Sequence, residues 1–107
     1  MQFSCLDLDA IIGFDWDKGN IYKNENKHGI TWQEIEEVFF NEPLLLYEDI
    51  KHSSKEERCF CLGQTDKGVA LFVAYTIRAN KIRAISARKV TKKEKEIYEK
   101  AKRNSKI

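Results

Sequence analysis

Three strand-like runs with very short turns between them limit the fold of this chain more than any other feature. The runs cover residues 58–64, 69–77 and 81–89, and the turns between them are Asp66-Lys67-Gly68 and Ala79-Asn80. Turns of this length join antiparallel neighbours, so the pattern predicts a three-stranded antiparallel meander. The middle run is apolar on both of its faces, which is typical of a central strand.

The segment before the meander predicts a strand, two helices and a second strand. Residues 11–15 are a short apolar run that we expect to form an edge strand. Asp17 is expected to cap a helix over residues 18–27, and Gly29 can end that helix in the left-handed conformation. Residues 44–47 are again short and apolar, and predict the strand that leads into the meander.

Capping boxes mark the other two helices. Thr31 is followed three residues later by Glu34, and Thr91 is followed in the same way by Glu94. The helix after Thr31 has one apolar face, and Pro43 is expected to stop it. The last helix is rich in Lys and Glu.

Together these elements predict an α+β fold with the order β-α-α-β-β-β-β-α. Two N-terminal helices and one C-terminal helix are expected to cover one face of a curved, twisted antiparallel sheet. The other face would stay partly open, which makes it a natural seat for a ligand. A chain of 107 residues is expected to form one domain over residues 1–107.

The charge is balanced overall but uneven along the chain. Nineteen Lys and Arg residues against seventeen Asp and Glu residues give a net charge of +2, which argues against a broad nucleic-acid-binding surface. From Ile77 to Ile107, however, there are twelve Lys or Arg residues and three Glu residues. This distribution favours a local site for an anionic substrate.

Two further expectations concern the membrane and the cysteines. No apolar run approaches the roughly 18 residues of a membrane span, and the N-terminus lacks the basic residues of a secretory signal, so we expect a cytoplasmic location without membrane association. Cys5, Cys59 and Cys61 are expected to be reduced, partly buried thiols, with Cys59 and Cys61 on one strand face. No second Cys or His pair stands at metal-ligand spacing, so no metal site is predicted.

Arginines of the meander are the first candidates for a functional site. Arg58 opens one strand, and Arg83 and Arg88 lie on another, with Arg78 at the turn before it. In a regular strand Arg83 and Arg88 would face opposite sides, but a β-bulge between them would bring both to one face. Converging guanidinium groups would bind phosphate and stabilise charge that develops on it. The alternative is that each arginine is a surface group, or the partner of a nearby acid such as Glu57.

Proton transfer would need a group such as histidine. His28 stands at the expected C-terminus of the first helix, beside Lys27. It is a candidate acid or base, although its position favours a role in satisfying the last carbonyls of the helix. His52 falls in a polar loop over residues 49–57 and is expected to be exposed.

The order and spacing of many of these residues resemble BrnT-type toxins over residues 12–100. The likeness is carried in the first half by Phe14-Asp15-Trp16-Asp17, Asn24 to Thr31, Glu34, Val38-Phe39 and Pro43, and in the second half by His52-Ser53, Glu57-Arg58, Leu62-Gly63, Ile82 to Arg88 and Tyr98. The chain departs from the family pattern at Asn20, where the family often carries lysine.

The resemblance implies a RelE-like fold and a ribonuclease that stops translation without a metal or cofactor. It also implies RNA as substrate, and a cognate BrnA-like antitoxin with a ribbon-helix-helix end through which operator DNA is bound. A homodimer and a toxin–antitoxin hetero-oligomer both remain open. A scaffold that binds the antitoxin as a non-catalytic corepressor is the alternative function.

Within that framework the candidate site residues divide into two groups. Arg58, Arg83 and Arg88 are expected to hold the phosphate and the charge of the transition state. Lys27 and His28 are the candidates for proton transfer, with Glu57 as orienting group or base.

Overall fold

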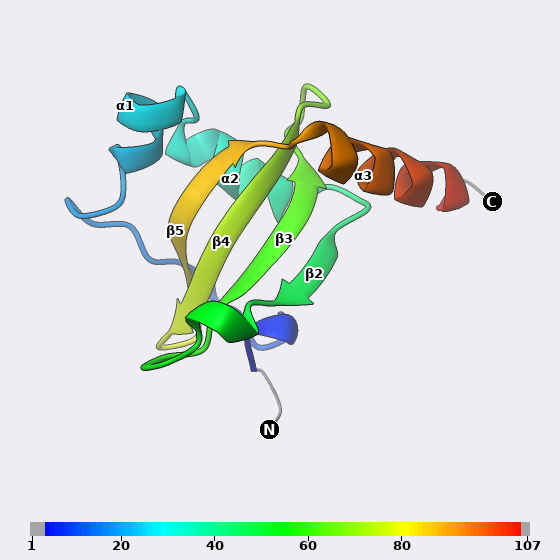
Figure 1. The fold of residues 1–107 in the computed structure, drawn as a ribbon. Coiled ribbons are helices and arrows are strands. Elements are labelled where there is room, and N and C mark those ends of the chain that lie inside the picture. The colour runs from blue at the N-terminus through cyan, green and yellow to red at the C-terminus, as the bar shows by residue number, and fades with distance from the viewer. Residues whose placement is uncertain (1–3, 106–107) are drawn as a thin grey trace.

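The computed structural model describes residues 4–105 and has a mixed α+β architecture (Figure 1). One five-stranded sheet is combined with three α-helices, as the sequence predicts in outline. Two short 3-10 helices, which the sequence did not predict, complete the elements within these residues. Their bounds are η1 (Ser4–Leu6), β1 (Gly13–Phe14), α1 (Lys23–His28), α2 (Trp32–Val38), β2 (Leu45–Glu48), η2 (Ile50–His52), β3 (Cys59–Gln64), β4 (Ala70–Arg78), β5 (Lys81–Lys89) and α3 (Lys92–Asn104).

The predicted meander is confirmed, and one edge of the sheet differs from the prediction. The strand order is β1-β5-β4-β3-β2, and every neighbouring pair from β2 to β5 is antiparallel. The edge strand β1 instead runs parallel to β5, with Ile12 N donating to Asn80 O at 2.9 Å and Asp15 N to Ile82 O at 2.8 Å. A wholly antiparallel sheet was therefore the wrong expectation. Because most of the chain lies between β1 and β5, no tight turn fixes their relative direction.

A β-bulge in β5 brings two arginines to one face of the sheet. Tyr75 pairs with Ala84 and Ala74 pairs with Ser86, so Ile85 has no partner residue on β4. On either side of this bulge Arg83 pairs with Thr76 and Arg88 pairs with Phe72. Thr76 and Phe72 are four residues apart on one strand and share a face. Arg83 and Arg88 therefore share that face, which we call the outer face.

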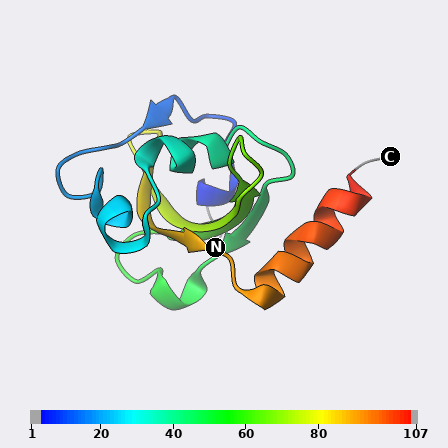
Figure 2. The same ribbon diagram turned by 90° about the horizontal axis from the view of Figure 1, so that it is seen from above.

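The inner face of the sheet carries the core. Cys61, Val73, Tyr75 and Ala87 point to it and are fully buried. The helix α2 packs here, so closely that a Cβ added to Gly63 would lie 2.6 Å from Val38 Cγ1. Figure 2 shows α2 within the curve of the sheet and α3 outside it. The expectation that all helices cover one face was therefore wrong.

The first helix is shorter than predicted. It spans Lys23–His28 and follows Tyr22, while residues 18–22 form turns. Asp17 does not cap the helix because its carboxylate accepts a hydrogen bond from Gly19 N at 2.8 Å and is paired with a distant arginine. Asn20 further fixes the turn by donating to Asp15 O at 3.0 Å and Ala84 O at 3.3 Å.

Three local signals at helix ends are confirmed, whereas α2 ends at Val38, before Pro43, which was expected to stop it. Both predicted capping boxes form, at Thr31 with Glu34 and at Thr91 with Glu94. Gly29 ends α1 in the left-handed conformation, with φ of 71°. These features depend on neighbours in the sequence, which is why the sequence alone predicts them.

Cys5 and Cys59 form a disulfide, so the expectation of three reduced thiols was wrong. Their Cα atoms lie 6.0 Å apart, and both side chains are fully buried. The N-terminal segment folds against the sheet, where the Tyr75 hydroxyl donates to Cys5 O at 2.6 Å. This packing brings Cys5 to a strand 54 residues away. Cys61 is a free, buried thiol, and burial raises its pKa.

Candidate functional site

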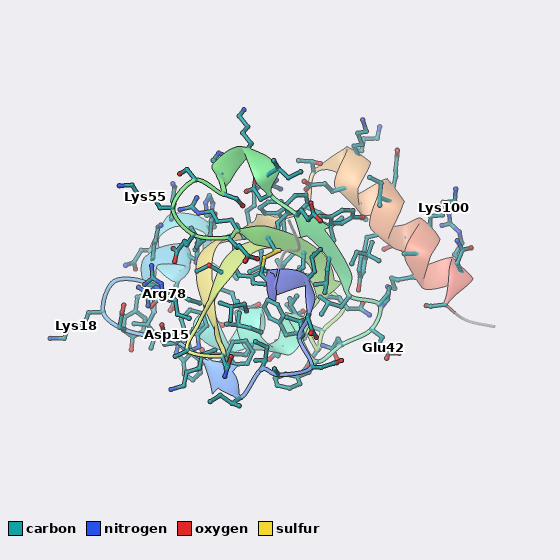
Figure 3. The ribbon with its side chains drawn as sticks, turned by 90° about the horizontal axis from the view of Figure 1, so that it is seen from below. Asp15, Lys18, Glu42, Lys55, Arg78 and Lys100 are labelled. Carbon is teal, nitrogen blue, oxygen red and sulfur yellow. A yellow bond between two sulfur atoms is a disulfide. The ribbon has the colours of Figure 1, made fainter. Side chains whose placement is uncertain are left out.

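Four basic side chains border one depression on the outer face of the sheet. The depression has a volume of about 190 Å³ and lies where the loop before β3, the end of β4, the first half of β5 and the turn that leads into α1 come together. Figure 3 shows Arg78, Asp15 and Lys18 on one side of the molecule, with Lys100 of α3 on the other. The lining residues are Gly19, Asn20, Lys23, Glu56, Arg58, Thr76, Arg78, Arg83, Ala84 and Ile85.

Arg83 is held by two carboxylates at the edge of the depression. Its guanidinium donates to both oxygens of Asp17, at 2.9 and 3.2 Å, and lies 3.5 Å from Asp15 Oδ1. The side chain is 16% exposed, so most of it is enclosed by its surroundings. The hydrogen bond from Arg83 lowers the pKa of Asp17, which keeps this carboxylate ionised.

Arg78 forms a second bidentate ion pair across the same depression. Its guanidinium donates to both carboxylate oxygens of Glu56, at 3.0 and 3.3 Å. This contact lowers the pKa of Glu56 and raises the pKa of Arg78. The pair therefore holds the loop before β3 against the end of β4.

Arg58 and Lys23 are the less neutralised cations of the depression. Neither belongs to a salt bridge among residues 4–105. The Lys23 ammonium donates to Ile85 O, the carbonyl of the bulge residue, at 3.2 Å. The backbone of Arg58 is fixed by Ser53, whose Oγ accepts from Arg58 N at 3.0 Å. A phosphate entering the depression would thus meet two cations that form no ion pair of their own.

The loop from Asp49 to Arg58 is tied to the sheet by side-chain hydrogen bonds. Ser53 Oγ donates to Asp49 O at 2.8 Å, and Asp49 N donates to Arg58 O at 2.9 Å. Thr76 Oγ1 donates to Glu57 O at 2.6 Å and joins the loop to β4. These bonds keep Arg58 beside the two strands that carry Arg78 and Arg83.

The structure brings together two of the three predicted phosphate-binding arginines. Arg58 and Arg83 line the depression. Arg88 shares their sheet face but lies elsewhere, with its guanidinium 4.1 Å from the ring centroid of Phe72 and bonded to both oxygens of Glu94 at 2.8 and 3.0 Å. This ion pair raises the pKa of Arg88 and lowers the pKa of Glu94.

The predicted proton-transfer groups do not line the depression. Lys27 and His28 form the last turn of α1, and His28 is followed directly by the helix-ending Gly29. Glu57 contributes its backbone carbonyl to Thr76, whereas its neighbour Glu56 is the residue that borders the depression. The roles of Lys27, His28 and Glu57 stay predictions.

Sequence reasoning missed Lys23, Glu56 and Thr76 as parts of the site, and it noted Arg78 among the basic groups of the meander without assigning it a role. Lys23 stands one helical turn before Lys27, and this i,i+4 spacing on one helix face was the available signal. Glu56 and Arg78 are 22 residues apart in the sequence, and no local sequence pattern predicts their contact. No group of three or more His, Cys, Asp or Glu side chains suited to a metal ion occurs within residues 4–105.

Comparison with known proteins identifies a family. Residues 16–94 match the model of the family described as "Ribonuclease toxin, BrnT, of type II toxin-antitoxin system". All residues that line the depression fall within this range. No curated protein sequence matches the chain. No helix within residues 4–105 has the length and apolar character needed to cross a membrane.

Proposed function

Because the chain belongs to the BrnT family of ribonuclease toxins of type II toxin–antitoxin systems, we propose that it is an endoribonuclease that cleaves RNA at the cationic depression. The family implies an RNA substrate and an antitoxin partner. The observation that carries the location is the convergence of Lys23, Arg58, Arg78 and Arg83 on one depression of the outer face.

Cleavage would proceed by attack of a ribose 2′-hydroxyl on the adjacent phosphorus. The bond from O2′ to phosphorus forms, the bond from phosphorus to O5′ breaks, and the products carry a 2′,3′-cyclic phosphate and a 5′-hydroxyl. Negative charge builds up on the phosphoryl oxygens in the transition state, and fixed cations stabilise it. Guanidinium groups suit this role because they remain charged and donate two parallel hydrogen bonds to phosphate. Lys23 and the three arginines of the depression would supply this charge without a metal or cofactor.

The carboxylates of the site would compete with the substrate phosphate for the arginine side chains. Asp17 accepts from both terminal nitrogens of Arg83, and Glu56 accepts from Nε and one terminal nitrogen of Arg78, so a phosphate would compete with these carboxylates. Arg58 and Lys23 are therefore the first contacts for an incoming phosphate. Exchange of Asp17 for the phosphate would then place Arg83 against the reacting group. Lys27, His28 and Glu57 remain proposed participants in proton transfer, with contacts that would have to form around bound RNA.

The resemblance extends the proposal to the cellular setting. We assign the chain a RelE-like fold, an action in the cytoplasm that inhibits translation, and a cognate BrnA-like antitoxin with a ribbon-helix-helix end. The antitoxin would cover the cationic depression, since charge complementarity steers such encounters. Binding of the complex to operator DNA would take place through the antitoxin.

Expression of the chain alone in a bacterium tests the proposal. Wild type should arrest growth and reduce total RNA, whereas an Arg58→Ala plus Arg83→Ala variant of equal abundance should do neither. If soluble, folded wild-type protein leaves growth and RNA unchanged, the non-catalytic antitoxin-binding function replaces the ribonuclease.

A further inference from the structure

His52 is oriented by a carboxylate in the loop that presents Arg58. Its Nδ1 atom lies 3.0 Å from each carboxylate oxygen of Asp49. An ionised carboxylate can only accept hydrogen bonds, so Nδ1 carries a proton and donates it to Asp49. The other ring nitrogen, Nε2, has no hydrogen-bond partner among residues 4–105 and is left to accept a proton. A carboxylate that fixes the tautomer of an imidazole in this way is a recurring feature of catalytic histidines.

The position of this pair links it to the cationic depression. Asp49 N donates to Arg58 O at 2.9 Å, so the residue that holds His52 is bonded directly to the backbone of a lining arginine. Ser53, the next residue after His52, accepts from Arg58 N through its Oγ. In Figure 1 the green 3-10 helix η2, which ends at His52, crosses in front of the ends of the central strands, on the side of the sheet opposite α2. The loop that carries His52 is thus the same loop that brings Arg58 to the depression.

The exposure of the two side chains suits a group that meets a large substrate. His52 is 56% exposed, whereas Asp49 is 18% exposed. The less exposed Asp49 carboxylate holds the imidazole through Nδ1, and the more exposed ring remains accessible to RNA. Exposed ion pairs contribute little to the stability of a fold, so stability alone gives little reason for this arrangement.

We propose that His52 is the general base of the proposed ribonuclease reaction and that Asp49 is its positioning residue. Nε2 of the neutral imidazole takes the proton from the 2′-hydroxyl as O2′ bonds to phosphorus. The leaving O5′ takes a proton from solvent, and His52 returns its proton to solvent after product release. The inference rests on the proposed function, because the step requires RNA bound with its scissile phosphate in the depression.

The chain offers a direct rival, since His28 is the other of its two histidines. Neither histidine is among the residues that line the depression, but the loop of His52 presents Arg58 to it, whereas His28 stands at the end of α1. Its ring has no hydrogen bond within residues 4–105 that would fix a tautomer, whereas His52 has Asp49. The geometry therefore favours His52 for the role that the sequence suggested for His28.

Chemical rescue of purified variants tests the assignment. Single-turnover cleavage of a short RNA is measured for wild type, His52→Ala, His28→Ala, Arg83→Ala and Ile50→Ala, with and without added imidazole. General-base catalysis typically contributes about 10²- to 10⁴-fold, so His52→Ala should be slower by that factor. Imidazole should restore part of its rate, because the exposed position leaves room for the small base. Ile50→Ala, an exposed change in the same 3-10 helix, should cleave like wild type.

The variants separate failure of this inference from failure of the proposed function. If wild type cleaves and Arg83→Ala does not, but His52→Ala cleaves at the wild-type rate, the ribonuclease stands and His52 is not its base. The inference is also overturned if imidazole fails to rescue a slow His52→Ala protein, or if His28→Ala is the variant that is slow and rescued. If folded wild type does not cleave RNA at all, the proposed function fails first. Asp49→Asn should lower the rate with little change in KM, as expected of a residue that acts through His52.

Discussion

Arg83 and Arg88 lie on the same strand and the same face of the sheet, yet their surroundings differ. Arg83 borders a depression with three other basic side chains and is held by carboxylates from a turn near the start of the chain. Arg88, whose side chain is 35% exposed, contacts the ring of Phe72 and the carboxylate of Glu94, which is also the capping-box residue of α3. The first environment leaves room for an anion, and the second is complete within the protein.

The difference teaches that residue type and strand face do not determine the role of an arginine here. The bulge at Ile85 places both arginines on the same face of the sheet, but the neighbouring elements decide what each one does. Beside Arg83 lie the ion pair between Arg78 and Glu56 and the depression that both arginines line. Beside Arg88 it provides a helix N-terminus whose Glu94 side chain completes the contact. We therefore expect function at one end of β5 and stability at the other.

The largest expected effect comes from removing the guanidinium at the depression. Arg83→Ala should slow RNA cleavage by a barrier increase of about 2.7 to 4 kcal/mol, by analogy with other donors that stabilise transition-state charge. Single-turnover cleavage kinetics, with circular dichroism as a check on folding, measure this effect. An unchanged cleavage rate in a folded Arg83→Ala protein would contradict the role of Arg83 in RNA cleavage.

A smaller effect on a different quantity is expected at the other end of the strand. Arg88→Ala should lower the free energy of unfolding by about 1 to 2 kcal/mol, because it removes a bidentate charge-assisted contact and a cation–aromatic contact that water screens in part. Urea unfolding gives the value. Loss of cleavage by Arg88→Ala at full stability would show instead that this arginine meets the substrate.

Removing the negative charge of Asp17, which pairs with Arg83, should strengthen RNA binding at the depression. Asp17→Asn leaves the guanidinium in place but removes the charge that competes with a phosphate, so binding of a non-cleavable 2′-O-methyl RNA should tighten by about two- to five-fold, as for a surface ion pair. Titration at low and high salt measures it. Glu48→Gln is the matched control, since Glu48 is an exposed carboxylate outside the depression. Equal tightening in both variants would indicate a general charge effect.

The smallest expected effect is a pH dependence of stability at Arg88. Arg88 lowers the pKa of Glu94 in the folded protein, so the pair stabilises the fold above the ordinary pKa of glutamate. This contribution is lost as the pH falls through the lowered pKa, where Glu94 becomes protonated. The difference in unfolding free energy between wild type and Glu94→Gln, expected to be below about 1 kcal/mol, should therefore vanish in acid. A difference that persists or grows in acid would contradict the assigned sign.

Local sequence signals predicted much of the fold. The meander follows from turns of two or three residues, and both capping boxes follow from a threonine and a glutamate three positions later. Gly29 ends α1 because the left-handed conformation there costs glycine little. In each case the residues that decide the structure are neighbours in the chain.

The errors arise where distant residues decide the structure. Asp17 fits a helix cap, but Arg83, 66 residues away, shares its carboxylate with the turn. Cys5 lies in a segment with no strong pattern, and only its packing against the sheet brings it to Cys59. The candidate site follows the same rule. Arg58 and Arg83 could be singled out by residue type, whereas the contact between Arg78 and Glu56 depends on how the loop before β3 folds back.

Analysis of the RNA ends made by purified protein in the presence of EDTA tests the central claim most directly. The account predicts that wild type produces 2′,3′-cyclic phosphate and 5′-hydroxyl ends at a rate that EDTA does not change. It also predicts that Arg88→Ala, once corrected for its folded fraction, produces them as fast, and that Arg83→Ala hardly does. Cleavage that EDTA abolishes, or equal losses in the two arginine variants, would contradict the account.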